Sequence, residues 1–158
     1  MSAQGTTTEP VAAAVPFRPG FLVGDFSAPE GLRLAGSRCN ACGIALFGQR
    51  HRCENCSSAD LQHVAFAKTG VVHTYTVQRY APPPPHALST KPWQPRPIAW
   101  IDIDENGPRI LGPISCSPED MGIGMKVQVD CSAGWQTADG TPVIAYAFAP
   151  MADKETAA

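Results

Sequence analysis

The sequence predicts an all-β protein in which a small four-cysteine ribbon precedes a five-stranded barrel. Three observations predict this fold class: two Cys-x-x-Cys pairs lie close together, proline (16) and glycine (14) are frequent, and short apolar segments of period two follow residue 70. Short strands and turns are typical of this combination, whereas helices of ordinary length need an apolar period of about 3.6 residues. A chain of 158 residues has room for one metal module and one compact barrel.

The N-terminal part shows no regular pattern. Residues 1–16 are rich in Ala and Thr, and we expect a mobile arm there. Residues 17–31 place Phe17, Phe21 and Phe26 between turn formers, which favours an irregular lead-in whose rings serve as packing contacts. We therefore divide the chain into a flexible arm with lead-in (1–31), a ribbon (32–60), a barrel (61–151) and a tail (152–158), with residues 61–67 connecting ribbon and barrel.

Cys39, Cys42, Cys53 and Cys56 are the predicted ligands of one metal ion. Two Cys-x-x-Cys pairs separated by ten residues match the ligand spacing of a structural zinc ribbon, and Gly43 supplies the backbone freedom that the first knuckle needs. Four thiolates complete a tetrahedral zinc shell and leave no position for substrate, so the ion has a structural role. Iron in a rubredoxin-like site is the alternative, because spacing does not separate the two metals.

Two other uses of the cysteines fit less well. Two disulfides need an oxidising compartment, and the first residues contain no basic and apolar signal sequence, so we expect a cytoplasmic protein. A catalytic dithiol is usually a single pair next to a βαβ pattern, which the sequence lacks.

Five strands follow the ribbon. They are predicted at residues 71–78, 98–103, 109–114, 126–131 and 142–148. Asn106-Gly107 indicates a hairpin between the second and third strands, and Ser117-Pro118 begins a short helix between the third and fourth. Five strands with a small helix at this place form an OB-fold. The predicted core consists of Val71, Tyr75, Val77, Ile101, Ile103, Leu111, Val127, Val129, Ile144 and Phe148.

Composition excludes some classes of partner. The net charge of −2 gives no overall attraction to nucleic acid or to an anionic membrane. No apolar segment approaches the roughly 18 residues of a membrane span. We expect no membrane partner.

Four stretches of the chain carry a family resemblance. They are residues 34–43, continued by Phe47, Arg50, Cys53 and Cys56, and residues 70–77, 107–112 and 118–125. Together they resemble the prokaryotic accessory proteins, built from a rubredoxin-like zinc ribbon and an OB-fold, that accompany thiolases and thiolase-like enzymes. Members include small subunits of benzoylsuccinyl-CoA thiolase and of steroid side-chain aldolases. The resemblance covers roughly residues 20–150.

The resemblance implies a non-catalytic subunit in a hetero-oligomer with a thiolase-fold catalytic subunit. The complex would act on acyl-CoA, such as an aromatic or steroid acyl-CoA, by thiolytic or retro-aldol carbon–carbon chemistry. Zinc would be structural, and a coenzyme A thioester would lie at the shared interface. The chain departs from the family pattern at Phe47-Gly48-Gln49-Arg50, where Phe-Pro-x-Arg is usual, and in a long proline-rich loop.

Five residues are candidates for contact with coenzyme A or with the partner. Arg38, Arg50 and Arg52 belong to residues 31–53, which contain no Asp or Glu. Arginine suits phosphate because its planar group binds two oxygens at once. The competing interpretation is a solvated basic rim that balances the thiolate charge. Trp93 and Arg96 lie at the end of a proline-rich arm, residues 82–97, for which a rigid surface loop is the competing interpretation.

Two other functions stay open at the sequence level. One is a module for single-stranded nucleic acid, since ribbons and OB-folds both bind it, although basic residues are scarce on the first three strands. The other is an independent acyl-CoA-binding protein or hydrolase. The four histidines pair with no acid or serine at a catalytic spacing, and Cys116 and Cys131 are expected to be buried. We expect no turnover from the chain alone.

Overall fold

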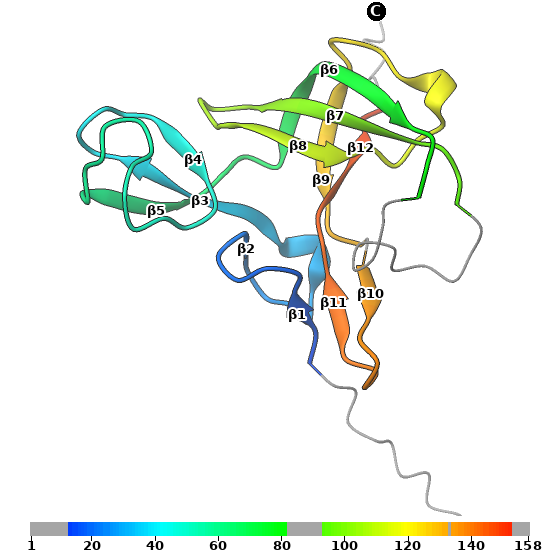
Figure 1. The fold of residues 1–158 in the computed structure, drawn as a ribbon, viewed down its shortest axis with the longest axis horizontal. Coiled ribbons are helices and arrows are strands. Elements are labelled where there is room, and N and C mark those ends of the chain that lie inside the picture. The colour runs from blue at the N-terminus through cyan, green and yellow to red at the C-terminus, as the bar shows by residue number, and fades with distance from the viewer. Residues whose placement is uncertain (1–12, 82–92, 133, 153–158) are drawn as a thin grey trace, which may run out of the picture.

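The part of the protein that the structure describes consists of β-strands and two short 3₁₀ helices (Figure 1). The computed structural model describes residues 13–81, 93–132 and 134–152. The only helices within these ranges are η1 (Pro29–Gly31) and η2 (Pro118–Asp120), which confirms the predicted all-β class. Neither of these helices is long or apolar enough to cross a membrane. Residues 82–92 of the proline-rich arm lie outside the described ranges.

Five strands form the barrel in the order β12-β9-β6-β7-β8. Their bounds are β6 Thr69–Gln78, β7 Arg96–Ile103, β8 Arg109–Pro113, β9 Lys126–Asp130 and β12 Ala147–Pro150. The barrel closes where Ile114, just after β8, forms a parallel bridge with Phe148, and the Ser115 amide donates to the Phe148 carbonyl at 2.7 Å. With η2 between β8 and β9, this is the predicted OB-fold.

The ribbon is built around strand β3 (Arg33–Cys39). It pairs with β2 (Leu22–Val23), β4 (Ala45–Phe47) and β5 (Leu61–Ala65). We expected residues 61–67 to be only a connection, but residues 61–65 pair with β3 over five positions. Apolar and polar residues do not alternate regularly in this segment. Its strand conformation is therefore seen only from its pairing with β3.

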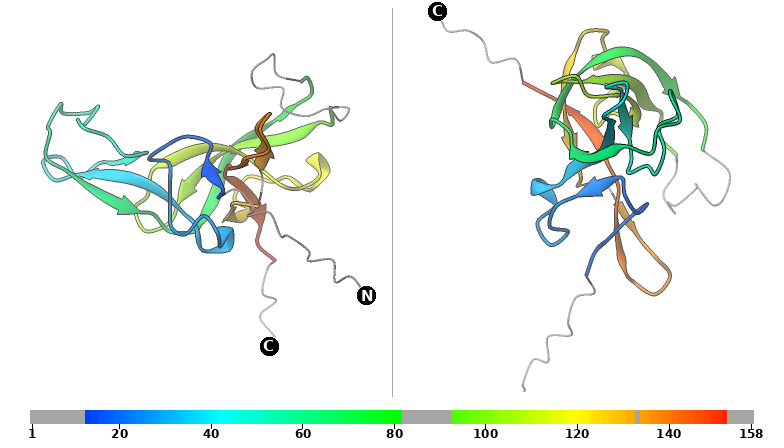
Figure 2. Two further views of the ribbon diagram at one scale, coloured as in Figure 1. Left: turned by 90° about the horizontal axis from the view of Figure 1, so that it is seen from below. Right: turned by 90° about the vertical axis from the view of Figure 1, so that its left-hand side faces the viewer.

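A third, small sheet pairs a strand from the N-terminal part of the chain with two strands from the C-terminal part. It contains β1 (Val15–Pro16), β11 (Pro142–Ile144) and β10 (Gly134–Gln136), and its β10–β11 hairpin projects from the barrel (Figures 1 and 2). Two expectations change here. Val15–Pro16 form a strand instead of belonging to an arm, and the predicted fifth strand is divided into β11 and β12, which pair in different sheets.

Tyr146, between β11 and β12, explains the division. Its ring packs against Phe17, Phe47 and Phe148, with centroid distances of 5.7, 5.4 and 6.0 Å, and its hydroxyl donates to the Leu111 carbonyl at 2.8 Å. These contacts come from the lead-in, the ribbon and the barrel, so the ring lies where all three meet. Burial raises the pKa of Tyr146 to about 12.

The phenylalanines of the lead-in are packing residues, as expected. Phe17 and Phe26 pack against the buried core. Phe21 lies edge-on to Phe47 with centroids 4.7 Å apart. The aromatic contacts thus fix the ribbon on the barrel.

The core prediction is confirmed at six of its positions, which are Ile101, Ile103, Val127, Val129, Ile144 and Phe148. It is wrong at Tyr75 and Leu111, which are exposed, and Val71 and Val77 are only half-buried.

Two backbone features explain the errors at Val71 and Leu111. A bulge between Val72 and Thr74 changes the phase of β6, so that Val72 faces inward. In β8 the inward positions are Ile110 and Gly112; a Cβ on Gly112 would lie 2.7 Å from the Phe148 ring, so only glycine fits there.

Candidate metal centre

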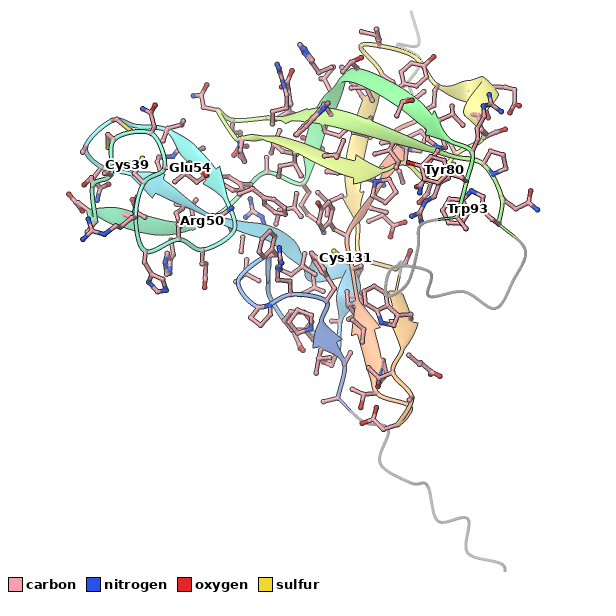
Figure 3. The ribbon with its side chains drawn as sticks, in the orientation of Figure 1. Cys39, Arg50, Glu54, Tyr80, Trp93 and Cys131 are labelled. Atoms are coloured by element: carbon pink, nitrogen blue, oxygen red, sulfur yellow. The ribbon has the colours of Figure 1, made fainter. Side chains whose placement is uncertain are left out.

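The four predicted ligands form one cluster at the tip of the ribbon, which we define as residues 39–58 (Figure 3). Their Sγ atoms all lie within 4.8 Å of one another. The Sγ atoms of Cys39 and Cys56 are 3.6 Å apart, as are those of Cys42 and Cys53. A disulfide needs about 2.0 Å, whereas ligands about 2.3 Å from a tetrahedral zinc ion are separated by about 3.8 Å. The cluster therefore fits a metal ion.

Two equivalent turns present the sulfurs. In the first turn the Gly43 amide donates to the Cys39 carbonyl at 2.8 Å, and in the second the Ser57 amide donates to the Cys53 carbonyl at 2.9 Å. Gly43 has φ +76° and Ser57 has φ +62°. Positive φ is ordinary for glycine and uncommon for serine, so the second turn must be held by other contacts.

Arginine side chains provide such contacts at both turns. Arg38 immediately precedes Cys39 and donates through Nη1 to the Gly43 carbonyl at 3.3 Å. Arg52 immediately precedes Cys53 and donates through Nη1 to the Ser57 carbonyl at 3.1 Å. The two knuckles are thus closed by the same Arg-to-carbonyl contact. The sequence contains this signal, because each arginine stands directly before the first cysteine of its pair.

Hydrogen bonds also set the acidity of the thiols. The Ile44 backbone amide, followed by the Asn55 side chain 3.6 Å away, lowers the pKa of Cys42 to about 6. The Ser58 amide acts in the same direction on Cys56, but hydrogen bonds with neighbouring thiols outweigh it and raise that pKa to about 12. The two thiols thus differ in acidity, and a bound divalent cation would displace the protons of both.

Arg38 also connects the ribbon to the barrel. Its Nη2 donates to the Asn106 carbonyl at 3.1 Å, in the turn between β7 and β8. The expected Asn-Gly hairpin is offset by one residue, because Glu105 and Asn106 carry the positive φ values of +57° and +57°. The Arg38 contact crosses from one unit to the other, so this side chain positions the tip relative to the sheet.

A groove of about 410 Å³ lies between the tip and the same turn. Arg50, Glu54 and Arg109 are its charged lining residues, and Ile44, Phe47 and Pro108 contribute apolar surface. Arg50 donates through Nε to the Phe47 carbonyl at 3.1 Å, while its backbone amide donates to the buried Ser37 hydroxyl at 2.9 Å.

The other two candidates lie elsewhere. Arg96 stacks over the Trp93 ring with 4.8 Å between Cζ and the centroid, and its Nε donates to Gln78 at 3.3 Å. Figure 3 shows Trp93 at the opposite end of the molecule from Arg50 and Cys39. The structure therefore gathers Arg38, Arg50 and Arg52 around the ribbon and separates them from Trp93 and Arg96.

One polar network escaped the sequence interpretation. The Asp102 carboxylate accepts from Arg109 Nε at 2.6 Å and Nη2 at 3.2 Å, and His73 Nδ1 lies 3.2 Å from it. Arg109 is the main cause of the lowered pKa of Asp102. The three residues come from three strands and meet through strand register and the β6 bulge, so no spacing along the chain announces them.

The two remaining cysteines are poor nucleophiles. Cys131 is buried, and burial raises its pKa. Cys116 is half-buried, and burial is the main cause of its raised pKa too. Its Sγ lies 3.4 Å from the Met121 sulfur. Neither thiol resembles the low-pKa thiolate of a covalent catalyst.

Comparison with known proteins places the chain in a family. A DUF35 domain-containing scaffold protein of Methanocaldococcus jannaschii is 33% identical over 121 residues, which cover 75% of this chain and 82% of that protein. The chain belongs to the DUF35 family. Residues 63–131 match the model described as the C-terminal OB-fold domain of ChsH2. These matches confirm the resemblance seen in the sequence.

Two further relatives are subunits or parts of enzymes by their descriptions. The solved structure of an "Ltp2-ChsH2(DUF35) aldolase" is similar with a TM-score of 0.54 and 28% identity, covering 78% of this chain and 89% of that one. A protein of Thermomonospora curvata described as "Probable enoyl-CoA hydratase alpha subunit" is 30% identical over 72% of this chain and 33% of its own length.

Proposed function

We propose that this DUF35 protein is the non-catalytic small subunit of a complex with a thiolase-fold enzyme that acts on acyl-CoA. The single observation that carries the proposal is the likeness, over 89% of the related chain, to a DUF35 chain named as part of an aldolase. The complex makes or cleaves a carbon–carbon bond next to a thioester, by thiolytic or retro-aldol chemistry. We also propose that the complex works in the cytoplasm.

The described side chains support a non-catalytic role. The four-thiolate cluster fits a zinc ion with no ligand position left for substrate, so zinc here has a structural function. The free thiols have raised pKa values. The partner supplies the nucleophile and the oxyanion donors, and this chain stabilises it and completes its acyl-CoA channel.

The groove beside the ribbon is the proposed place for the coenzyme A end of the substrate. Arg50 and Arg109 line it together with Glu54 and apolar residues, and arginine binds phosphate oxygens in pairs. Arg38 and Arg52 hold the two knuckles of the ribbon, and Glu54 of the second knuckle lines the groove. Trp93 and Arg96, at the other end of the molecule, are proposed as partner contacts. The proline-rich arm favours a bulky acyl group, such as an aromatic or steroid acid.

Co-expression tests the proposal. We expect a thiolase-fold protein to be encoded beside this chain in its genome and to co-purify with it, and the pair should cleave an acyl-CoA that neither protein cleaves alone. A partner that is fully active by itself and does not co-purify would contradict the proposal. Robust thioester hydrolysis by the isolated chain would instead support an independent hydrolase.

A further inference from the structure

Arg38 and Arg52 close the two knuckles in the same way, but of the two only Arg38 also reaches the described part of the barrel. Each donates through Nη1 to the carbonyl of its own knuckle, at 3.3 Å for Gly43 and 3.1 Å for Ser57. Arg38 Nη2 also donates to the Asn106 carbonyl at 3.1 Å, in the turn between β7 and β8. One planar guanidinium therefore holds two carbonyls from different parts of the molecule at a fixed separation.

The turn that Arg38 reaches has a strained backbone. Glu105 has φ +57° and Asn106 has φ +57°. Asparagine often adopts this left-handed conformation, whereas glutamate rarely does, and such residues persist only where surrounding contacts hold them. Within the turn, the Gly107 amide donates to the Asp104 carbonyl at a long 3.2 Å. A restraint from outside the turn is therefore expected, and Arg38 supplies one.

The groove of about 410 Å³ lies between the two parts that Arg38 joins. Its lining residues come from two places, which are the tip between residues 44 and 54 and the segment 106–109. Figure 1 shows the turn end of the β7–β8 hairpin directed toward the ribbon. Among the residues that the structure describes, no other hydrogen bond joins the ribbon to this turn. Arg38 is thus the hydrogen-bonded link between the two walls of the groove.

We propose that Arg38 is a positioning residue that couples the metal centre to the shape of this groove. The Gly43 carbonyl that Arg38 holds lies directly after Cys42, so its place depends on the knuckle that presents the ligands. Metal binding and knuckle folding are linked, because the unfolded chain has no preformed site. With metal bound, Arg38 holds the 104–107 turn in place; without it, Arg38 loses its first anchor and the turn becomes mobile. The inference concerns the groove whatever occupies it, so it does not depend on the proposed function.

NMR spectroscopy of the full-length, zinc-loaded chain tests the coupling. The readout is the backbone order parameter of residues 105–107, together with their amide chemical shifts. We expect Arg38→Gln to lower the order parameter from about 0.85 to below about 0.6, while strands β7 and β8 stay rigid. The matched control is Arg52→Gln, which removes the equivalent knuckle contact and should leave the turn unchanged. Arg38→Lys should behave like Arg38→Gln, since lysine keeps the charge but lacks the planar fork.

Zinc removal by chelation gives a second measurement that leaves Arg38 unaltered. It should mobilise residues 105–107 in the wild-type chain and cause no further change in Arg38→Gln. Glu105→Asn lies outside the ribbon and should reduce the effect of zinc removal, because asparagine tolerates the left-handed conformation. This variant keeps the test decisive if metal analysis shows that Arg38→Gln does not retain its equivalent of zinc.

Four results would overturn the proposal. The first is a turn as rigid in zinc-loaded Arg38→Gln as in the wild-type chain. The second is an equal mobility of the turn in zinc-loaded Arg52→Gln, which would mean that the knuckles in general hold it. The third is a wild-type turn that zinc removal leaves unchanged. The fourth is an equal response of Glu105→Asn and wild type to zinc removal, which would mean that the turn needs no restraint against strain.

Discussion

The ribbon tip and the barrel are stabilised by different means. The tip, residues 39–58, buries one small cluster formed by Cys39, Leu46 and Cys53, with Leu61 packed on it. The barrel and the base of the ribbon share a core that contains seventeen buried residues among those the structure describes. The boundary runs through a single strand, because β3 contributes Leu34 to the large core and Cys39 to the small one.

This difference indicates what each part depends on. A cluster of three buried residues cannot offset the conformational entropy of twenty ordered ones, so the tip needs its metal. The barrel has an ordinary apolar core and should fold without metal. The contacts of Tyr146 and Arg38 then determine where the tip sits, since they join the two parts. The following predictions test this division, from the largest expected effect to the smallest.

Loss of a metal ligand should unfold the tip and spare the barrel. Cys39→Ser removes one of four thiolates, and a structural zinc ion contributes on the order of 10–16 kcal/mol in isolated finger peptides. We expect the variant to lose its equivalent of metal and the tip amides to exchange rapidly, with β6–β9 still protected. Metal analysis and hydrogen exchange measure both. Cys131→Ser, at another buried cysteine, is the control and should retain the metal. Barrel amides that also lose protection would contradict the division.

Truncation of the barrel core should lower the stability of the barrel. Ile110 is 2% exposed and its neighbour Leu111 is 45% exposed. Ile110→Ala should cost about 2–5 kcal/mol, because it leaves a cavity, while Leu111→Ala should stay within about 0.5 kcal/mol. Denaturant unfolding monitored by tryptophan fluorescence gives both values. Equal losses would show that the inward phase of β8 is assigned incorrectly.

A methyl group at the boundary between tip and barrel should destabilise both. A Cβ on Gly36 would lie 2.2 Å from the Phe66 ring and 2.4 Å from the Leu46 carbonyl oxygen. We expect Gly36→Ala to cost about 1–3 kcal/mol through overpacking. Gly122→Ala is the control, since a Cβ there meets nothing within 4 Å. A Gly36→Ala chain as stable as wild type in denaturant would mean that β3 shifts freely between its two cores.

The Asp102 network should give a small stabilisation that depends on pH. Arg109 lowers the pKa of Asp102 below its ordinary 3.8, so the contribution is complete above that value and is lost as pH falls through the lower folded-state pKa. The side chain is 45% exposed. We therefore expect Asp102→Asn to cost no more than about 1 kcal/mol at neutral pH and low salt.

That cost should shrink as the pH falls below 3.8 and disappear once the wild-type carboxyl is protonated in the folded state as well. Unfolding free energies measured between pH 2 and 7 provide the test. Glu105→Gln, at the exposed turn between β7 and β8, is the control. A cost that stays constant with pH would mean that the Asp102 contacts are not electrostatic.

The sequence by itself determined the features that depend on neighbouring residues. The metal ligands follow from two Cys-x-x-Cys knuckles, each of which closes within five residues. Strands β6 to β9 follow from period-two alternation, and the OB-fold follows from their number and the position of η2. The arginine that closes each knuckle was also available in the sequence, as the residue before each first cysteine.

Only the tertiary structure decided the features that depend on distant strands. The pairing of β5 with β3, the division of the last strand at Tyr146 and the inward phase of β8 each result from contacts far apart in the chain. The network of His73, Asp102 and Arg109 needs the bulge and the register of three strands together. A one-residue change of register exchanges the two faces of a strand, so local alternation predicts that a strand exists but not which side it buries.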